Sequence, residues 1–139
     1  MRTYLLDSGP VAAFLLGRKA AVDLITPWIM NSEAATSILV YAEVVEYIKG
    51  RSHFSHHHEA LRDLLSEIYP YFLTFSILDR YADIRRMLRP PYGTGLIGDI
   101  DTLIAATALE LDLTVVTVDG DFQRVPDLKV MKVVLKSGS

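Results

Sequence analysis

Two short apolar runs in this sequence each lead directly to an aspartate. The first covers residues 3–6 and ends at Asp7, and the second, which is the most hydrophobic in the chain, covers residues 113–118 and ends at Asp119. Short runs of apolar and β-branched residues are typical of buried strands. Strands of this kind need helices on both faces, so the pair already predicts a sheet enclosed between helical layers.

The residues between the two runs carry the patterns of helices and of further strands. Apolar residues recur at helical spacing in several segments, and glycine or proline residues mark where these segments end. We expect helices over residues 8–16, 20–30, 39–49, 59–69, 78–88 and 101–111, and strands over residues 3–6, 34–37, 71–75, 113–118 and 130–135. Alternating strands and helices predict an α/β/α sandwich with a central, mostly parallel sheet.

The chain length and composition limit the classes of protein that are compatible with the sequence. The 139 residues fit one domain, expected over residues 1–136, with residues 137–139 as a flexible tail. No apolar run is long enough to span a membrane. The first run is interrupted by Asp7, whereas a secretory signal needs an unbroken apolar segment. We therefore expect a cytoplasmic protein. The chain has no cysteine, which excludes disulfides and thiolate metal sites.

Acidic residues occur at four positions where a surface acid has no evident purpose. Asp7 and Asp119 follow predicted strands and should lie at the carboxyl edge of the sheet, where open α/β folds bind their ligands. Asp101 shares a helical face with the apolar residues that follow it, and Glu43 lies next to Val44 on the packed side of its helix. We therefore expect these four side chains to converge.

Converging carboxylates repel one another, so either their pKa values rise or a divalent cation neutralises them. An all-oxygen ligand set without cysteine favours Mg²⁺ or Mn²⁺ over zinc. Such an ion can hold a phosphodiester and lower the pKa of a bound water molecule. Metal-assisted phosphodiester hydrolysis is the chemistry that these residues indicate. The net charge of −3 is unusual for a nucleic-acid-binding protein, unless metal ions supply positive charge locally.

Each acidic residue also has an ordinary structural explanation when it is considered alone. Asp7 can cap the helix that follows it, as lone aspartates at strand ends usually do and as Ser8 also can, and Asp121 can cap the short turn that follows it. Asp99 is expected to cap the helix that carries Asp101, and Glu43 can pair with nearby basic residues. The histidine-rich residues 52–58 are best explained as a solvated connection or a helix start, with zinc binding as a minor alternative.

Four segments resemble the acidic motifs of PIN domains, in the same order and at the usual spacings. They are YLLDS at residues 4–8, YAEV at 41–44, IGDIDTLIAATAL at 97–109, and VTVDGDF at 116–122 followed by RVPDL at 124–128. The third is the most specific, and the resemblance extends from Tyr4 to about Leu128. Many small prokaryotic proteins of this kind are VapC-like toxins of type II toxin–antitoxin systems.

The resemblance implies a ribonuclease whose acidic quartet, Asp7, Glu43, Asp101 and Asp119, surrounds Mg²⁺ or Mn²⁺. Asp121 is the other candidate for the fourth acid, because family members differ in which acid of this segment reaches the metal. The resemblance also implies that two residues, Ser8 and Thr117, orient the acids by hydrogen bonds. The implied partners are an RNA substrate, a cognate VapB-like antitoxin and a second copy of the chain.

Two rival functions remain to be weighed. Haloacid-dehalogenase-type phosphatases also carry an aspartate after the first strand, but they need a second aspartate two residues later, where this chain has Gly9. The other rival is a non-catalytic PIN-like module that binds RNA or protein, and acids at all four positions argue against it. The number of metal ions and the RNA target are left open.

Overall fold

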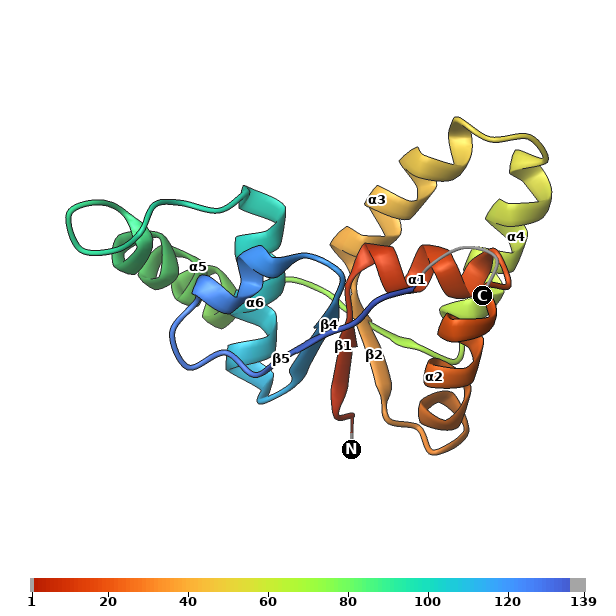
Figure 1. Cartoon of the computed structure of the whole chain (residues 1–139), viewed down its shortest axis with the longest axis horizontal. Coiled ribbons are helices and arrows are strands. Elements are labelled where there is room, and N and C mark those ends of the chain that lie inside the picture. The colour runs from red at the N-terminus through yellow and green to blue at the C-terminus, as the bar shows by residue number, and fades with distance from the viewer. Residues whose placement is uncertain (1, 136–139) are drawn as a thin grey trace.

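The computed structural model describes residues 2–135, so the expected tail at residues 137–139 lies outside the described part of the chain. The elements follow one another in an alternating order (Figure 1). They are β1 (Tyr4–Leu6), α1 (Ser8–Leu15), α2 (Lys19–Met30), β2 (Ala34–Ser37), α3 (Ile38–Lys49), α4 (Phe54–Leu64), β3 (Tyr69–Tyr71), α5 (Phe75–Leu88), α6 (Asp99–Leu111), β4 (Thr114–Thr117), a 3-10 turn η1 (Gly120–Arg124) and β5 (Val130–Lys132).

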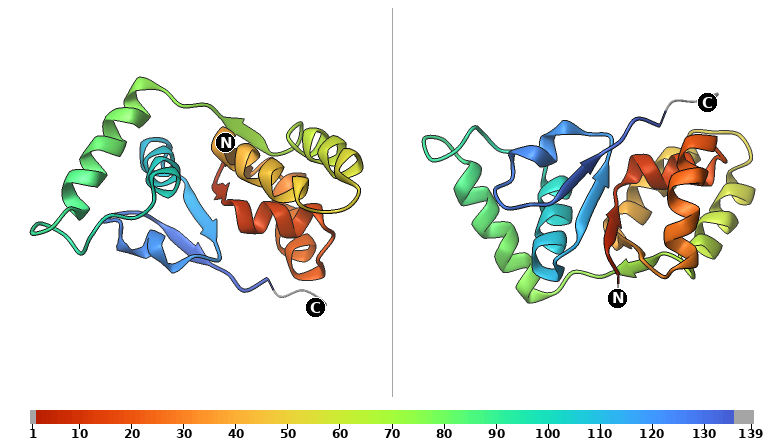
Figure 2. Two further views of the ribbon diagram at one scale, coloured as in Figure 1. Left: turned by 90° about the horizontal axis from the view of Figure 1, so that it is seen from above. Right: turned by 60° about the horizontal axis from the view of Figure 1, so that its bottom comes forward.

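The strands within residues 2–135 form one five-stranded sheet in the order β3-β2-β1-β4-β5, and every neighbouring pair is parallel. Helices α1 to α4 cover one face of the sheet, and α5 and α6 cover the other, as the three ribbon views agree (Figures 1 and 2). The predicted α/β/α sandwich is therefore confirmed. No helix within this part of the chain is both long and apolar enough to cross a membrane.

The central strands are buried because both of their faces carry apolar side chains. Leu5 and Leu6 of β1 and Val115 and Val116 of β4 are fully shielded from solvent. Helix α6 packs on this sheet through an almost continuous set of small and branched residues, and six of its thirteen residues are buried. Alanine side chains let the helix approach the sheet closely, and burial of this apolar surface is the main source of the stability of the fold.

The strand register brings the carboxyl ends of the central strands to one edge. Leu6 lies opposite Thr36 of β2 on one side and opposite Val116 of β4 on the other. The Thr36 hydroxyl donates to the Leu6 carbonyl at 2.7 Å, and the Asp7 amide donates to the Val116 carbonyl at 2.9 Å. Residues that follow β1 and β4 are therefore close neighbours at the top of the sheet in Figure 1.

The N-cap of α1 is Asp7, one of its two candidates, but the Asp7 carboxylate makes no capping bond and instead accepts a hydrogen bond from Thr117. The start of α6 differs from the prediction. Helix α6 is capped by Gly98 and begins at Asp99, so Asp99 is not the cap. Its carboxylate accepts hydrogen bonds from Tyr81 and Arg85 of α5, which hold it away from the backbone of its own helix.

The segment between α3 and α5 also differs from the prediction. Of the two explanations for the histidine-rich segment, the helix start is the one found, because α4 begins at Phe54, and the Phe54 ring stacks on His58 with 5.2 Å between centroids. The helix predicted over residues 59–69 ends at Leu64. The third strand lies at residues 69–71 rather than 71–75, because Thr74 caps α5 by accepting the Ile77 amide at 3.2 Å.

Candidate functional site

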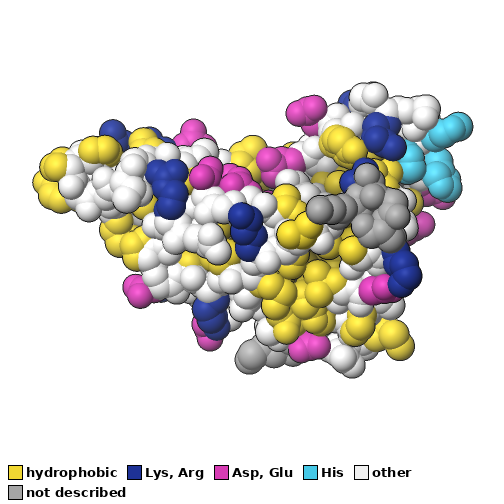
Figure 3. All heavy atoms as spheres, in the orientation of Figure 1, with side chains coloured by type: hydrophobic (Ala, Val, Ile, Leu, Met, Phe, Trp, Pro, Cys, Tyr) yellow, Lys and Arg dark blue, Asp and Glu magenta, His cyan; other side chains and the backbone are white. Residues whose placement is uncertain are grey.

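Five acidic side chains gather at the carboxyl edge of the sheet. Figure 3 shows acidic groups in the hollow along the upper edge of the molecule, between the α5–α6 side and the α3–α4 side. They come from four parts of the chain: one follows β1, one lies on α3, one lies in the first turn of α6, and two lie at η1, as its N-cap and in its first turn. In chain order they are Asp7, Glu43, Asp101, Asp119 and Asp121.

Asp7 is the most deeply placed of these acids. Its side chain is buried, its Oδ2 accepts the Thr117 hydroxyl at 2.8 Å, and its Oδ1 has no hydrogen-bond partner within residues 2–135. Burial raises the pKa of the Asp7 carboxyl, the hydrogen bond from Thr117 opposes this rise, and the charge of Asp119 adds to it. A buried carboxylate oxygen without a partner is costly, so this position favours a proton or a cation.

Thr117 connects two of the acids through one hydroxyl group. The fully buried Oγ1 donates to Asp7 and accepts the backbone amide of Asp119 at 3.0 Å. Asp119 then caps η1, because its Oδ1 accepts the Asp121 amide at 2.9 Å. The predicted cap at Asp121 is therefore wrong, since the preceding acid performs that role. This chain of bonds fixes the backbone between the two strand-end acids.

Glu43 approaches the cluster from the second turn of α3. Its Oε1 is buried and has no hydrogen-bond partner in the described part of the chain. Burial raises the pKa of Glu43, the charge of Asp7 raises it further, and the Ser8 side chain lowers it. A groove between α1 and α3, with Gly9 and Tyr47 among its lining residues, opens beside this carboxylate.

Asp101 lies where the charges of all the other acids act on it. Burial is the largest cause that raises its pKa to about 7, and Asp7, Asp119, Glu43 and Asp121 each raise it further. One carboxylate oxygen from each of Asp101, Asp119 and Asp121 lies within 4.8 Å of the others. Both candidates for the fourth acid therefore belong to the cluster.

This arrangement is chemically suited to a hard divalent cation. The available ligands are carboxylate oxygens, which Mg²⁺ and Mn²⁺ prefer, and two of those oxygens are buried without a hydrogen-bond donor among residues 2–135. The pKa values of Asp7, Glu43 and Asp101 are raised, first by burial and then by the charges of neighbouring acids, so the ionised form is unfavourable at all three positions. A cation at this edge would remove that penalty for all three groups.

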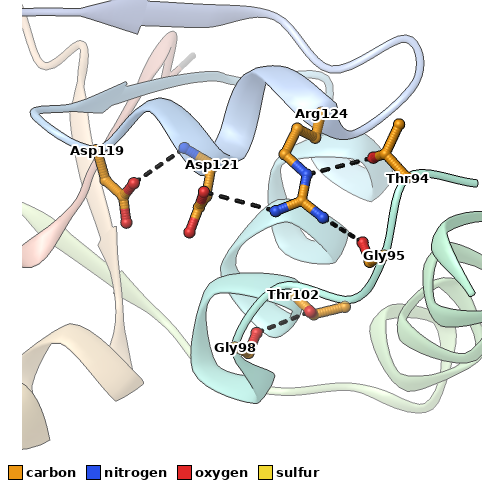
Figure 4. A network of polar contacts seen from close by, with 7 residues as sticks. All are labelled: Thr94, Gly95, Gly98, Thr102, Asp119, Asp121 and Arg124. Atoms are coloured by element: carbon orange, nitrogen blue, oxygen red, sulfur yellow. Dashed lines mark hydrogen bonds and ion pairs between the residues drawn. The ribbon is translucent and has the colours of Figure 1, made fainter.

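The structure adds one residue to this site for which the sequence offered no role. Arg124 of η1 places one end of its guanidinium 3.6 Å from Asp121 Oδ1 and directs its other nitrogens to Thr94 and Gly95, as Figure 4 shows. The sequence signal for it was an arginine three residues after an acid in a short turn. Its two partners in the loop, Thr94 and Gly95, are about thirty residues away in the chain.

The sequence matches the family described as PIN domain over residues 4–128, which is most of the chain. It matches no curated protein sequence. Among solved structures, the chain is similar to VapBC2 from Rickettsia felis bound to a DNA fragment from their promoter. That match has 21% sequence identity and a TM-score of 0.82, and it covers 95% of this chain and 99% of that chain.

Two further solved structures give the same result. VapBC-1 from nontypeable Haemophilus influenzae has 21% identity and a TM-score of 0.78, with 94% of this chain and 97% of that chain covered. DNA-bound VapBC from Salmonella typhimurium has 16% identity and a TM-score of 0.83, with 95% and 98% covered. At these identities the likeness establishes the shared fold.

Proposed function

Because the chain belongs to the PIN domain family, we propose that it is a metal-dependent endoribonuclease and the toxin of a VapBC-type toxin–antitoxin pair. The observation that carries the nuclease proposal is the pair of buried, unpartnered carboxylate oxygens, Asp7 Oδ1 and Glu43 Oε1, at the carboxyl edge of the sheet. A site that leaves two such oxygens without donors is completed by a cation. Cations at such an edge bind phosphodiesters and activate water.

In this proposal Asp7, Glu43, Asp101 and Asp119 hold Mg²⁺ or Mn²⁺, directly or through water, and Asp121 is the alternative fourth ligand. When bound, the ion supplies the positive charge that polarises the scissile phosphodiester and lowers the pKa of the attacking water. Two further side chains keep the acids oriented, Thr117 through its hydrogen bond to Asp7 and Ser8 through its influence on Glu43.

The proposed partners follow from the likeness to the VapBC structures. Those proteins are named VapBC, and a further similar structure, VapBC-5 from Mycobacterium tuberculosis, is named as a member of the VapBC family of toxin–antitoxin systems. This chain shares their fold over almost the whole length of both chains. We propose a VapB-like antitoxin as the partner of this chain, and a homodimer as its assembly. A phosphodiester of RNA is the proposed substrate, which the acidic protein reaches with the help of the bound cation.

The test uses purified protein, structured RNA, and either Mg²⁺, Mn²⁺ or EDTA. The variant Asp101→Asn should abolish cleavage and weaken metal binding measured by calorimetry, because it removes the acid on which the other charges converge. A matched control is Asp112→Asn, which removes an exposed acid at the other end of α6. Asparagine tolerates the left-handed backbone of that position, φ 55°, so the control should cleave like the natural chain.

The possible outcomes separate the proposal from its rival. Cleavage that requires metal and is lost in Asp101→Asn but kept in Asp112→Asn would support the nuclease. RNA binding without cleavage, together with no metal binding, would instead favour the non-catalytic PIN-like module. Cleavage that persists in EDTA would contradict metal dependence.

A further inference from the structure

We infer that Arg124 is a positioning residue that connects the turn carrying Asp119 and Asp121 to the loop leading into α6. Through this connection it keeps Asp119 and Asp121 at a fixed position relative to Asp101. The inference rests on the proposed function, because it concerns the geometry of the proposed metal site. Arg124 itself need not touch metal or RNA.

The guanidinium of Arg124 divides its donors among three protein groups. Nε donates to Thr94 Oγ1 at 3.3 Å, Nη2 donates to the Gly95 carbonyl, and Nη1 lies 3.6 Å from Asp121 Oδ1. Figure 4 shows the side chain reaching across from η1 to the loop with all three contacts made at once. A planar guanidinium with donors in fixed directions is suited to joining three groups in this way.

The loop that Arg124 reaches is firmly packed on its other side. The Gly95 amide donates to the Leu88 carbonyl at 2.7 Å, and a side chain at Gly93 would come within 2.2 Å of the Met87 carbonyl oxygen. Gly95 has φ 117°, and a Cβ there would lie 3.4 Å from Arg124 Nη2. The loop is therefore held between the end of α5 and the arginine.

From this loop only a few residues lead to Asp101. Ile97 is buried, and Gly98 caps α6 while its carbonyl accepts the Thr102 hydroxyl at 2.8 Å. A shift at Gly95 is therefore passed along a short, well-bonded segment to the first turn of α6. Arg124 thus joins the two backbone segments whose acids come within 4.8 Å of one another.

Two other roles for Arg124 make opposite predictions. A residue that binds RNA phosphate needs free donors, and its loss would raise KM and reduce the dependence of binding on salt. A residue that acts only through its charge would oppose cation binding at Asp121, so its removal would strengthen metal affinity. A positioning residue instead lowers kcat and weakens metal affinity when it is removed.

The experiment compares Arg124→Gln and Arg124→Lys with the natural chain. We expect kcat for RNA cleavage to fall roughly 10- to 100-fold, Mn²⁺ affinity to fall by a similar factor, and KM to change little, as is usual for groups that orient metal ligands. Arg124→Lys should not restore kcat or Mn²⁺ affinity, because an ammonium group lacks the planar arrangement of donors of a guanidinium. Backbone amides of residues 93–98 should exchange with deuterium faster in both variants.

The matched control is Lys129→Gln, which removes one positive charge and one ion pair, to Asp112, from the opposite edge of the sheet. It should leave kcat, Mn²⁺ affinity and exchange of residues 93–98 unchanged. If Arg124→Gln does not fold, Thr94→Val takes its place, since it removes one of the three contacts and should produce a smaller loss in the same readouts.

Tighter Mn²⁺ binding, full rescue by lysine, or a rise in KM alone would each overturn the inference. Failure of the proposed function has a different signature, because a natural chain that cleaves no RNA still reports on Arg124 through Mn²⁺ affinity and amide exchange. Unchanged exchange at residues 93–98 in Arg124→Gln would overturn the positioning role even if the chain proved to be an active nuclease.

Discussion

The two halves of the acidic cluster differ in how the protein supports them. In the first half, Asp7 and Glu43 each keep a buried carboxylate oxygen without a partner in the described residues. In the second half, Asp119 accepts a backbone amide and Asp121 lies beside Arg124, with half of its side chain exposed. The protein therefore supplies partners to both acids of the second half, whereas within the described residues it leaves one buried oxygen unpaired on each acid of the first half. Asp101 is influenced by both halves.

The largest contrast should appear when one acid of each half is made neutral. We expect Asp7→Asn to lower RNA cleavage by roughly 100-fold or more, the scale set by loss of a key electrostatic group. The same change should raise the melting temperature of the metal-free protein, because the amide removes a charge whose burial is unfavourable. Cleavage assays and thermal unfolding in EDTA measure the two effects.

Asp121→Asn is the comparison variant in the second half. Because Asp121 is half exposed and already faces Arg124, its neutralisation should leave the metal-free melting temperature nearly unchanged and reduce cleavage less than Asp7→Asn does. Equal effects of the two variants on both readouts would show that the halves do not differ in the way described.

A smaller effect should follow from cutting the link between the halves. Thr117→Val keeps the shape of the side chain but leaves Asp7 Oδ2 and the Asp119 amide without their shared hydroxyl. We expect a loss of about 1–3 kcal/mol in unfolding free energy, as is typical for buried groups left unpaired. Mn²⁺ affinity should fall by roughly tenfold, as for other groups that orient metal ligands.

Thr107→Val is a matched control for this variant. Thr107 is also buried, but its hydroxyl donates to the Leu103 carbonyl within α6, away from the acids. Urea unfolding should therefore show a smaller loss of stability for Thr107→Val than for Thr117→Val. Metal calorimetry should show no loss of metal affinity for Thr107→Val. A drop in metal affinity in both would assign the effect to general loosening of the core.

A further predicted effect is a dependence of the unfolding free energy on pH. The Asp101 pKa rises from an ordinary 3.8 to about 7 in the folded protein, so between these values the folded state binds more protons than the unfolded state. The unfolding free energy of metal-free protein should therefore fall as pH rises through this range and level off above it. Mg²⁺ should reduce the slope, and Asp101→Asn should flatten it. A metal-free stability that rises with pH over this range would contradict the assignment.

The local pattern of apolar and acidic residues in the sequence was sufficient to predict the parts of the fold that bring the acids together. A buried strand followed by an acid is visible within a few residues, and the face shared by Asp101 and Ile104 can be read from helical spacing. The third strand could not be placed in this way, because its register is decided by pairing with β2, in which Ala35 lies opposite Tyr69. That the Asp7 carboxylate makes no capping bond could not be predicted for a similar reason, since Thr117 donates to it from 110 residues away.

The same distinction applies to the candidate site. The acids were predicted because strand ends and helix faces place them, and the structure puts the other four where their charges raise the pKa of Asp101, although their roles stay a prediction. Arg124 could not be found, because two of its three partners are an unremarkable threonine and a backbone carbonyl in a distant loop. Contacts with backbone groups leave no trace in the residue types of a sequence.

The order of the strands also has a consequence for how this protein is made. The central strand, β1, leaves the ribosome more than one hundred residues ahead of one of its two neighbours, β4. Until residues 114–117 have been synthesised, β1 has an open edge on that side, and transiently unpaired strand edges favour aggregation. For the same reason Asp7 cannot meet Thr117 or Asp119 until those residues have been synthesised, so the growing chain carries no assembled acidic cluster before that point.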